Sequence, residues 1–379
     1  MKRVERRKIR RELWRLHSNF TVWVSKVFYE PIRRIIFDHF FQHLLNLNSG
    51  ELKLTQRVAV LVIFQPQGVL QSTLLLLDHL RENDWSVLVV SNHKLTVLDR
   101  AKVLSQCSQL MERPNVGYDF GAYRDGIRYL WKLDKKPENL VLLNDSTWFP
   151  IRSNDTSLRR MEALKVDLSG HIYKIEVAKK RERDHLESHL LMFGKRFLEH
   201  PAFLQFWNNY RMSDNRGNTI KYGEKKITQT ALSLGLSVQG LHTRDSFLEI
   251  LGKLSDVELS NIVRQMVHHS SDAKAYCDKL LAKFEAKQPW REDYLTWVYD
   301  ALSNSLQHRL SVTFVEPAVH LSGMGFLKKA RDTRSQLARF AVLKAEDEKR
   351  IEALNDVVRQ EIEASVKSQT QPSFNQVRS

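Results

Sequence analysis

The apolar residues in the middle of the chain follow two patterns that predict secondary structure. Continuous apolar runs with the length of buried strands occur at 57–64, 86–92 and 139–145. Residues 70–80 and 95–107 instead carry apolar residues at helical spacing. This order of strand, helix, strand and helix, with short connections, predicts a mostly parallel sheet flanked by helices. The expected fold class is therefore α/β, and further strands are predicted within 169–177, 185–193 and 236–241.

The remaining segments predict helical additions to this core. Residues 245–310 have helical patterns, and Ser255 with Glu258 forms a capping box at the start of one helix. The segment 335–366 predicts one long charged helix, and the polar tail is expected to be disordered. We therefore divide the chain into a basic amphipathic helical extension at 1–50, a core at 51–244, a helical insertion at 245–310, a return to the core at 311–334, the long helix at 335–366 and the tail at 367–379.

The net charge of +15 needs an anionic partner or a solvated basic surface. Eight of the first fifteen residues are Lys or Arg, and aromatic side chains such as Trp14, Trp23 and Phe40 follow them. This combination is typical of a helix that lies on an anionic membrane, although the segment could equally pack on the core with its basic face in water. Nucleic acid is a less favoured partner, because the sequence has no zinc finger, RNA-recognition motif or repeated aromatic and basic pattern.

The cysteines and the hydropathy pattern indicate in which cellular compartment the protein is expected. Cys107 and Cys277 are far apart and lack metal-ligand spacing, which disfavours a disulfide framework or a zinc site and fits a reducing compartment. No apolar run approaches the roughly 20 residues that span a bilayer, and the basic N-terminus does not have the pattern of a secretory signal. We expect a cytoplasmic protein, at the inner face of the cell membrane if its N-terminal segment binds lipid.

The segment "NVGYDFGAYRDG", residues 115–126, combines a glycine-punctuated loop with the start of a predicted helix. Asp119 stands where an N-cap is expected, and one helical face is apolar. Arg124, Asp125 and Arg128 fall outside that face and are expected to point at a ligand or at solvent. A helix N-terminus beside a glycine loop favours an anion such as a diphosphate. The spacing matches neither the P-loop nor the dinucleotide-binding fingerprint.

A second polar segment follows a buried strand. The run "LVLL" ends at Asn144, Asp145 and Ser146. Ligands of open α/β sheets bind outside the carboxyl ends of the strands. These three side chains could hold a hydroxyl or, through oxygen ligands, a divalent cation. The same residues are also good turn formers, so the purely structural interpretation stays open.

The two segments together resemble the nucleotide-sugar glycosyltransferases of the GT-A fold, which carry a similar loop and helix before a strand that ends in a D-x-D triplet. Closer still, "NVGYDFGAYRDG" with "LLNDSTWFP" is similar to the rhamnan synthesis protein F family of bacterial cell-surface polysaccharide assembly. The resemblance extends over 57–242 and over "VHLSGMGFLKKA" at 319–330. It implies a GT-A-like core that transfers a sugar, with rhamnose as a candidate, from a nucleotide diphosphate to a cell-surface polysaccharide or lipopolysaccharide glycan, whose acceptor is a glycan or a lipid-linked glycan.

The resemblance also implies which residues form the site. Asp145 and Glu224 are the expected catalytic carboxylates, and Glu224 could alternatively be an N-terminal-turn residue that the helix dipole favours. The expected donor-binding residues are Asn115, Gly117, Asp119, Gly121, Arg124, Asn144, Asp145 and Ser146. By their spacing, His185 and His189 could pair as ligands on a helix, but "LESHLLMF" indicates a strand, and histidines without a functional role are commoner. His320 is a weaker candidate of the same kind, for pyrophosphate or metal.

The departure from the family pattern concerns the metal. Where a D-x-D triplet offers two carboxylates, this chain has a single Asp145 between Asn144 and Ser146. Mg²⁺ or Mn²⁺ dependence is therefore in doubt, and Arg124 and Arg128 could balance the diphosphate instead. The loss of carboxylates also suggests an alternative, in which a degenerate transferase fold binds glycan or scaffolds an assembly complex without catalysis.

Overall fold

The computed structural model describes residues 30–133, 136–175, 177–178, 181–182, 184–268, 270–304 and 308–367. The basic segment at 1–29 and nearly all of the polar tail, whose structure we predicted above, lie outside this range. Among the described residues, no helix combines the length and the apolar character needed to cross a lipid bilayer.

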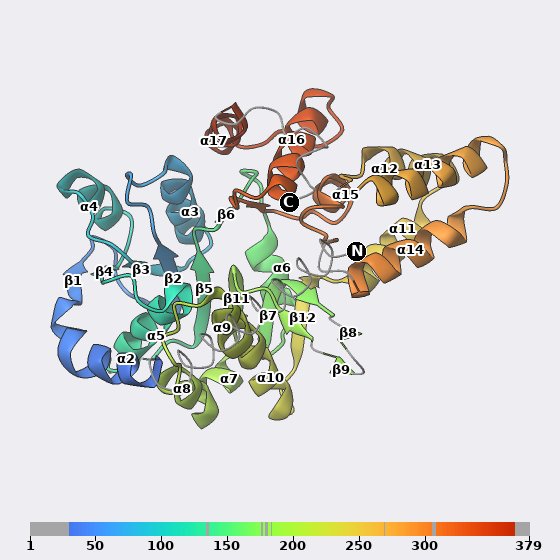
Figure 1. The fold of residues 1–379 in the computed structure, drawn as a ribbon. Helices are drawn as coiled ribbons and strands as arrows, with labels where there is room; N and C mark the ends of the chain where they lie inside the picture. Colours follow the sequence, from blue (N-terminus) through green and yellow to red (C-terminus); the bar gives the residue numbers. More distant parts are fainter. Residues whose placement is uncertain are drawn as a thin grey trace, which may run out of the picture.

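The centre of the fold is a mixed sheet that is largely parallel (Figure 1). Its parallel half has the order β4 (Gln109–Glu112), β3 (Ser86–Ser91), β2 (Arg57–Ile63) and β5 (Asn139–Asn144). The helices that connect these strands are α3 (Gln71–Glu82), α4 (Val97–Leu104) and α5 (Tyr118–Leu130). The predicted α/β class with a mostly parallel sheet is thus confirmed.

The other half of the sheet continues from β5 with an antiparallel strand. β11 (Leu190–Phe193) lies antiparallel between β5 and β7 (Leu168–Lys174), and β12 (Val238–His242) is parallel to β7. Two short strands, β1 (Asn46–Ser49) and β10 (His185–Leu186), pair antiparallel with β4 and β7. The polar strands β1 and β4 were not predicted, because neither has a continuous apolar run.

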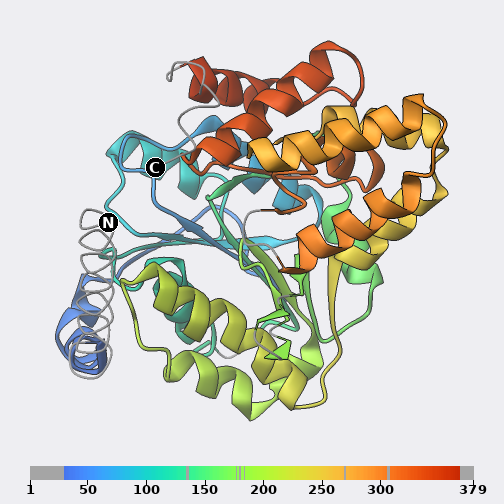
Figure 2. The same ribbon diagram turned by 45° about the vertical axis from the view of Figure 1, so that its right-hand side comes forward.

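Both faces of the sheet are buried, which explains the continuous apolar runs of its central strands. In β2, Ala59 and Leu61 belong to the core on the side of α3, whereas Val58 and Val60 belong to the core on the side of α5. Figure 2 shows the two helical layers on opposite sides of the sheet. The layer with α5 also contains α7 (Lys195–Glu199), α8 (Pro201–Asn208), α9 (Arg216–Thr219), the π-helical turn η4 (Ile220–Glu224) and α10 (Lys225–Ser233).

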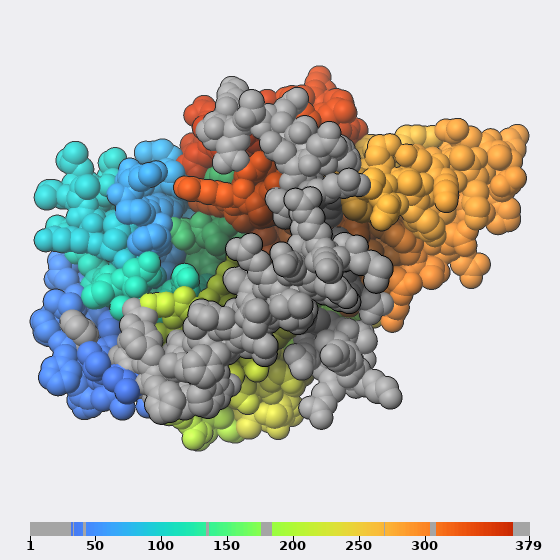
Figure 3. Space-filling model, viewed as in Figure 1, coloured from blue at the N-terminus to red at the C-terminus, as the bar shows by residue number. Residues whose placement is uncertain are grey.

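The predicted helical insertion consists of α11 (Arg244–Lys253), α12 (Asp256–Gln265), α13 (Ser271–Glu285) and α14 (Arg291–Asn304). It projects from the core at the right of Figures 1 and 3. The capping box is confirmed, since Ser255 Oγ accepts from the Glu258 N–H while the Glu258 carboxylate accepts from the Ser255 N–H.

The long helix predicted at 335–366 is wrong, because the segment forms α16 (Thr333–Asp347) and α17 (Asp356–Lys367). Between them Lys349 takes a positive φ of 57°, and the chain turns so that Ile351 and Leu354 become buried. Arg359 then pairs back with Glu346 of α16. The turn thus buries two apolar side chains, and the sequence interpretation did not take them into account.

The remaining elements are short. They are α2 (Glu30–Ile36), η2 (Phe37–Phe41), η3 (Gln42–Leu44), β6 (Thr147–Trp148), α6 (Ser157–Ala163), β8 (Val177–Ala178), β9 (Arg181–Glu182), α15 (Val315–Leu321) and β13 (Leu327–Lys328). Of these, β6 and β13 pair with each other.

Candidate functional site

A cavity of about 640 Å³ opens at the carboxyl ends of the parallel strands. Phe64 after β2, Asn92 after β3 and Asp145 after β5 all reach it, as expected for a ligand site in an open α/β sheet. The sequence-predicted residues that line it are Asn115, Asp119, Asn144, Asp145, Ser146, His185, His189 and Glu224. The donor-binding candidates Gly117, Gly121 and Arg124 do not line it, nor does His320.

The glycine loop shapes the start of α5 rather than the cavity wall. Gly117 is the N-cap with φ of +79°, a conformation that glycine adopts without cost, and its N–H donates a 2.7 Å hydrogen bond to Asp214. The helix begins at Tyr118, so Asp119 lies in the first turn and the predicted N-cap role is wrong. At Gly121 a Cβ atom would lie 2.3 Å from the carbonyl oxygen of Val116, so only glycine lets the loop pack on the helix.

The polar triplet after β5 is held in a hydrogen-bonded arrangement. Asn144 Nδ2 donates a 2.9 Å bond to Asp119 Oδ2, and Asn144 Oδ1 accepts from both the N–H and the hydroxyl of Ser146. Asp145 Oδ2 accepts from the N–H of Phe64 at 2.8 Å and from Gln65 Nε2 at 2.9 Å. Both bonds engage the same carboxylate oxygen of Asp145, a residue that lines the cavity.

Two more carboxylates border the cavity. Burial raises the pKa of Asp119 to about 6, and the nearby negative charge of Glu224 adds to this increase. Glu224, at the junction of η4 and α10, accepts bonds from the N–H of Ser188 at 2.9 Å and from its hydroxyl at 2.6 Å. Its other oxygen lies 3.6 Å from His185 Nε2. Glu224 is therefore held in a fixed position in the cavity wall.

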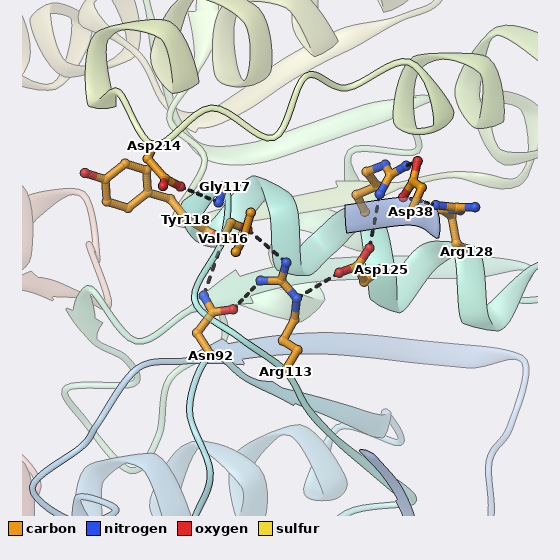
Figure 4. Close-up of polar contacts among 10 residues, drawn as sticks. Asp38, Asn92, Arg113, Val116, Gly117, Tyr118, Asp125, Arg128 and Asp214 are labelled. Carbon is orange, nitrogen blue, oxygen red and sulfur yellow. Dashed lines mark hydrogen bonds and ion pairs between the residues drawn. The ribbon is translucent and has the colours of Figure 1, made fainter. Parts of the chain in front are cut away.

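The prediction that Arg124 and Arg128 point at a ligand is wrong. Both side chains extend from α5 to Asp38 of η2, at 2.6 Å and 2.9 Å. Asp125 is also buried and pairs with Arg113 at 2.8 Å (Figure 4). Residues 124 and 128 are four apart and so share one face of the helix, but the carboxylate they meet lies 86 residues earlier, where no local pattern indicates it.

The cations that do line the cavity were missed by sequence reasoning. They are Lys174, Arg216, Lys225, Arg309, Lys328 and Lys329. Against the four carboxylates of Asp119, Asp145, Glu187 and Glu224, this lining has an excess of positive charge. The resemblance to the family covered 57–242 and 319–330, which contain all of these cations except Arg309, but it did not single any of them out.

The pairing of β6 with β13 places the two adjacent lysines. Lys328 lies opposite Thr147 in the register, and the N–H of Lys329 donates a 2.9 Å bond to the carbonyl of Ser146. Lys328 Nζ is 2.7 Å from Glu187 Oε2. Although burial opposes its charge, this lysine holds the pKa of Glu187 well below its usual range.

Three buried histidines lie close together, and His189 among them lines the cavity. His171 Nδ1 and His189 Nε2 are 3.2 Å apart, and the rings of His171 and His242 are 6.5 Å apart. Burial lowers the pKa of His189 and of His242 to about 3, and that of His171 well below its ordinary value.

The donor set does not fit a divalent cation held by protein side chains. Asn144 Oδ1 and one oxygen of Asp145 are already occupied by hydrogen bonds. Within the part of the chain that the structure describes, no group of three or more His, Cys, Asp or Glu side chains could hold a metal ion. The metal role proposed for His320 is not supported, because this residue is exposed in the last turn of α15.

Part of the chain, including both motifs, is similar to a known protein family. Residues 87–246 match the family described as rhamnan synthesis protein F, and this range contains both motifs. The chain is also 29% identical over 323 residues to an uncharacterised protein, y4gN, of Sinorhizobium fredii (strain NBRC 101917 / NGR234), which covers 85% of this chain and 83% of that protein.

Three solved structures are distantly similar. Core-mannan synthase A from Aspergillus fumigatus, in a Mn/GDP form, is 11% identical with a TM-score of 0.32 over 52% of this chain and 75% of its own. A mannosyltransferase from Pyrobaculum calidifontis, in complex with GDP-Man and Mn²⁺, is 14% identical with a TM-score of 0.26 over 47% and 56%. The mannosyltransferase Ktr4p from S. cerevisiae is 10% identical with a TM-score of 0.30 over 53% and 72%.

Proposed function

We propose that this protein is a glycosyltransferase that takes its sugar from a nucleotide diphosphate donor. The match of residues 87–246 to the rhamnan synthesis protein F family supports this class. The observation that carries the proposal is the cavity, in which Asp119 of the loop-helix motif and Asp145 of the strand-end motif meet a cationic wall. Such a wall suits a diphosphate, and the carboxylates suit the hydroxyl groups of a nucleoside and a sugar.

Different residues of the cavity wall have different roles in the proposed transfer reaction. In the proposed reaction an acceptor hydroxyl oxygen bonds to the anomeric carbon of the donor while Glu224 takes the hydroxyl proton. The bond from that carbon to the diphosphate oxygen breaks, and the cations of the lining stabilise the negative charge that remains on the diphosphate. Asp119 and Asp145 accept hydrogen bonds from donor hydroxyls and fix the orientation of the sugar. No step in this scheme requires a metal ion.

The sugar and the acceptor are the finer part of the proposal. The family description makes rhamnose the first donor sugar to test, and a growing cell-surface polysaccharide or lipopolysaccharide glycan the first acceptor. We place the reaction at the cytoplasmic face of the membrane. Apolar side chains that are exposed on the N-terminal elements support contact with a bilayer. They are Ile32, Ile35, Ile36, Phe40 and Leu44.

A non-catalytic function remains the second candidate, because one observation favours it. The position of an expected metal-binding carboxylate is occupied by Asn144, whose oxygen is bonded to Ser146. A protein of this kind would bind a nucleotide sugar or glycan and would not transfer it.

Thermal stabilisation by a panel of nucleotide sugars, followed by a transfer and hydrolysis assay, tests the proposal. A donor at 100 times its dissociation constant should stabilise the protein by about 2.7 kcal/mol. Binding with turnover supports the transferase, whereas binding without transfer or hydrolysis supports the non-catalytic alternative. If no nucleotide sugar stabilises the protein, the proposed function is wrong.

A further inference from the structure

Lys329 lies where the cavity meets the two C-terminal helices. Its Nζ is 3.2 Å from the hydroxyl oxygen of Ser72 in α3 and 5.5 Å from the ring centre of Trp148 in β6. Lys329 also lines the cavity, as does Asp145, whose negative charge favours the charged form of the lysine. The ammonium group has three donors. With one of them at Ser72, the other two can serve a ligand in the cavity.

Glu361 of α17 fixes the two residues that hold this lysine. Its Oε1 accepts from the N–H of Ser72 at 2.9 Å, and its Oε2 accepts from the Ser72 hydroxyl at 2.6 Å and from Trp148 Nε1 at 2.8 Å. The Ser72 hydroxyl therefore accepts from Lys329 and donates to Glu361. This chain of hydrogen bonds connects a carboxylate outside the cavity wall to an ammonium group inside it.

Arg339 of α16 fixes the backbone on either side of the same lysine. Its Nη1 donates to the carbonyl of Lys328 at 3.2 Å and to that of Ala330 at 2.8 Å. The guanidinium also lies 5.7 Å from the ring centre of Trp148, and the residue is only 2% exposed. Both C-terminal helices thus direct a charged group at the position of Lys329, the buried Arg339 from α16 and the half-buried Glu361 from α17.

We propose that Lys329 binds the diphosphate of the donor and that Glu361 and Arg339 are positioning residues for it. The proposal rests on the function proposed above, because it assigns the diphosphate to a nucleotide sugar. It gives α16 and α17 a role in the site, although they follow the matched range 87–246 by many residues.

Glu361 could have a purely structural role, in which it only docks α17 on α3. The protonation of Lys329 distinguishes this role from a positioning role. Burial lowers the pKa of Lys329, while Asp145 and Glu361 act to raise it. Asp145 and Glu361 are the two carboxylates whose charges act on the ammonium, and Arg339 contacts the backbone on either side of it. Removing the charge of Glu361 should lower the pKa further, so that Lys329 loses its proton, and with it its affinity for an anion, at a lower pH.

The experiment measures binding of inorganic pyrophosphate to the full chain by calorimetry between pH 7 and 11, a range that includes the ordinary lysine pKa of about 10.4. We expect Lys329→Met to weaken binding at least tenfold at pH 7.5, because a charged hydrogen bond is lost. Glu361→Gln should move the alkaline loss of binding down by roughly half a pH unit or more. The matched control is Glu363→Gln, on the same helix, whose side chain instead pairs with Arg359 at 3.1 Å and should leave the profile unchanged.

Each outcome decides the proposal. Unchanged pyrophosphate affinity in Lys329→Met overturns it, and so does a Glu361→Gln profile that overlays the wild-type profile at every pH. If Glu361→Gln does not fold, Ser72→Ala takes its place, since it removes the hydroxyl between the two charges. Wild-type affinity in that variant also overturns the proposal.

The design separates this inference from the proposed function. If Lys329 and Glu361 govern pyrophosphate binding but no nucleotide sugar is transferred or hydrolysed, the subsite stands and the transferase does not. If transfer occurs and these variants leave pyrophosphate binding unchanged, the transferase stands and the subsite does not.

Discussion

Asn144 donates a hydrogen bond of 2.9 Å from its side-chain amide to the carboxylate of Asp119. The bond joins the carboxyl end of β5 to the first turn of α5 and so connects the two sequence motifs directly. Because the amide donates without adding charge, it favours the ionised form of a carboxyl group whose pKa burial raises to about 6. The protonation of Asp119 should therefore change within an experimentally accessible pH range.

The first prediction concerns donor affinity and pH. If Asp119 accepts a hydrogen bond from a donor hydroxyl, affinity should fall as the pH drops through about 6, because the protonated group is a weaker acceptor. Such a bond to a charged group contributes about 1.5–3 kcal/mol. Titration of donor binding at several pH values in wild type and in Asp119→Asn checks this. A step near pH 6 that persists in the variant would assign it to another group.

The second prediction is that Asp145→Ala abolishes sugar transfer and leaves the protein folded. The lost carboxylate strands the N–H of Phe64 and the amide of Gln65, but Phe64 is exposed and water can replace the bond. We expect turnover to fall by at least a hundredfold, with a small decrease in melting temperature. Wild-type turnover in Asp145→Ala would remove this residue from the site.

The glycines of the loop give a third prediction. Gly117→Ala places a side chain at a positive φ, which costs about 1–2 kcal/mol, and its Cβ would also lie 3.0 Å from the Met212 backbone. Gly235→Ala is the matched control, since its φ of +67° is similar and nothing lies within 4 Å of the added atom. Gly117→Ala should therefore destabilise more than Gly235→Ala in chemical denaturation, and it should also weaken donor binding. Equal destabilisation would show that packing around Gly117 adds nothing.

The fourth prediction concerns acid stability. His171, His189 and His242 are buried as neutral rings with lowered pKa values, so the unfolded chain binds their protons first. Each should cost about 1.4 kcal/mol of unfolding free energy per pH unit as the pH falls below about 6.5. The raised pKa of Asp119 opposes part of this slope between its ordinary value and about 6.

His242→Leu tests that slope directly. Its Nε2 has no hydrogen-bond partner in the structure, so a leucine should be accepted and should remove one histidine's share of the pH dependence. His320→Leu is the control, because that side chain is exposed. Denaturation midpoints between pH 7 and pH 4.5 that fall equally in wild type and His242→Leu would contradict the interpretation.

The fifth prediction concerns the apolar side chains near the N-terminus. Ile35→Ser with Phe40→Ser should weaken binding to anionic vesicles and spare the fold, since the two side chains are 50% and 66% exposed. The control is Val97→Ser with Leu98→Ser on α4, which removes even more exposed apolar groups from a different surface. Co-sedimentation at 0.1 M and 1 M salt, where the Debye length shortens from about 10 Å to 3 Å, separates the charge contribution from the apolar one. If the wild-type protein ignores anionic vesicles at low salt, the membrane proposal is wrong.

The sequence predicted features that depend on neighbouring residues better than it predicted contacts between residues far apart in the chain. The strand at 57–64 was predictable because a strand buried on both faces is apolar throughout. Asn144 and Asp145 were placed correctly because a strand end determines which edge of the sheet they reach. Arg124 was misplaced, since its helical face was known but Asp38, which that face meets, was not. Lys329 reaches the site only through the pairing of β13 with β6, a contact between distant segments that no local pattern encodes.

That pairing also sets an order for the assembly of the protein during synthesis. Thr147 and Lys328, partners in the register, are separated by roughly 180 residues. At about 5–20 residues per second, a ribosome needs roughly 10 to 40 s to deliver the second strand after the first. Over that interval the nascent chain can form its parallel sheet, yet Trp148 still lacks both its strand partner and Glu361. The emerging protein therefore exposes an indole and an unfinished strand edge to other chains and chaperones until this C-terminal part has been made.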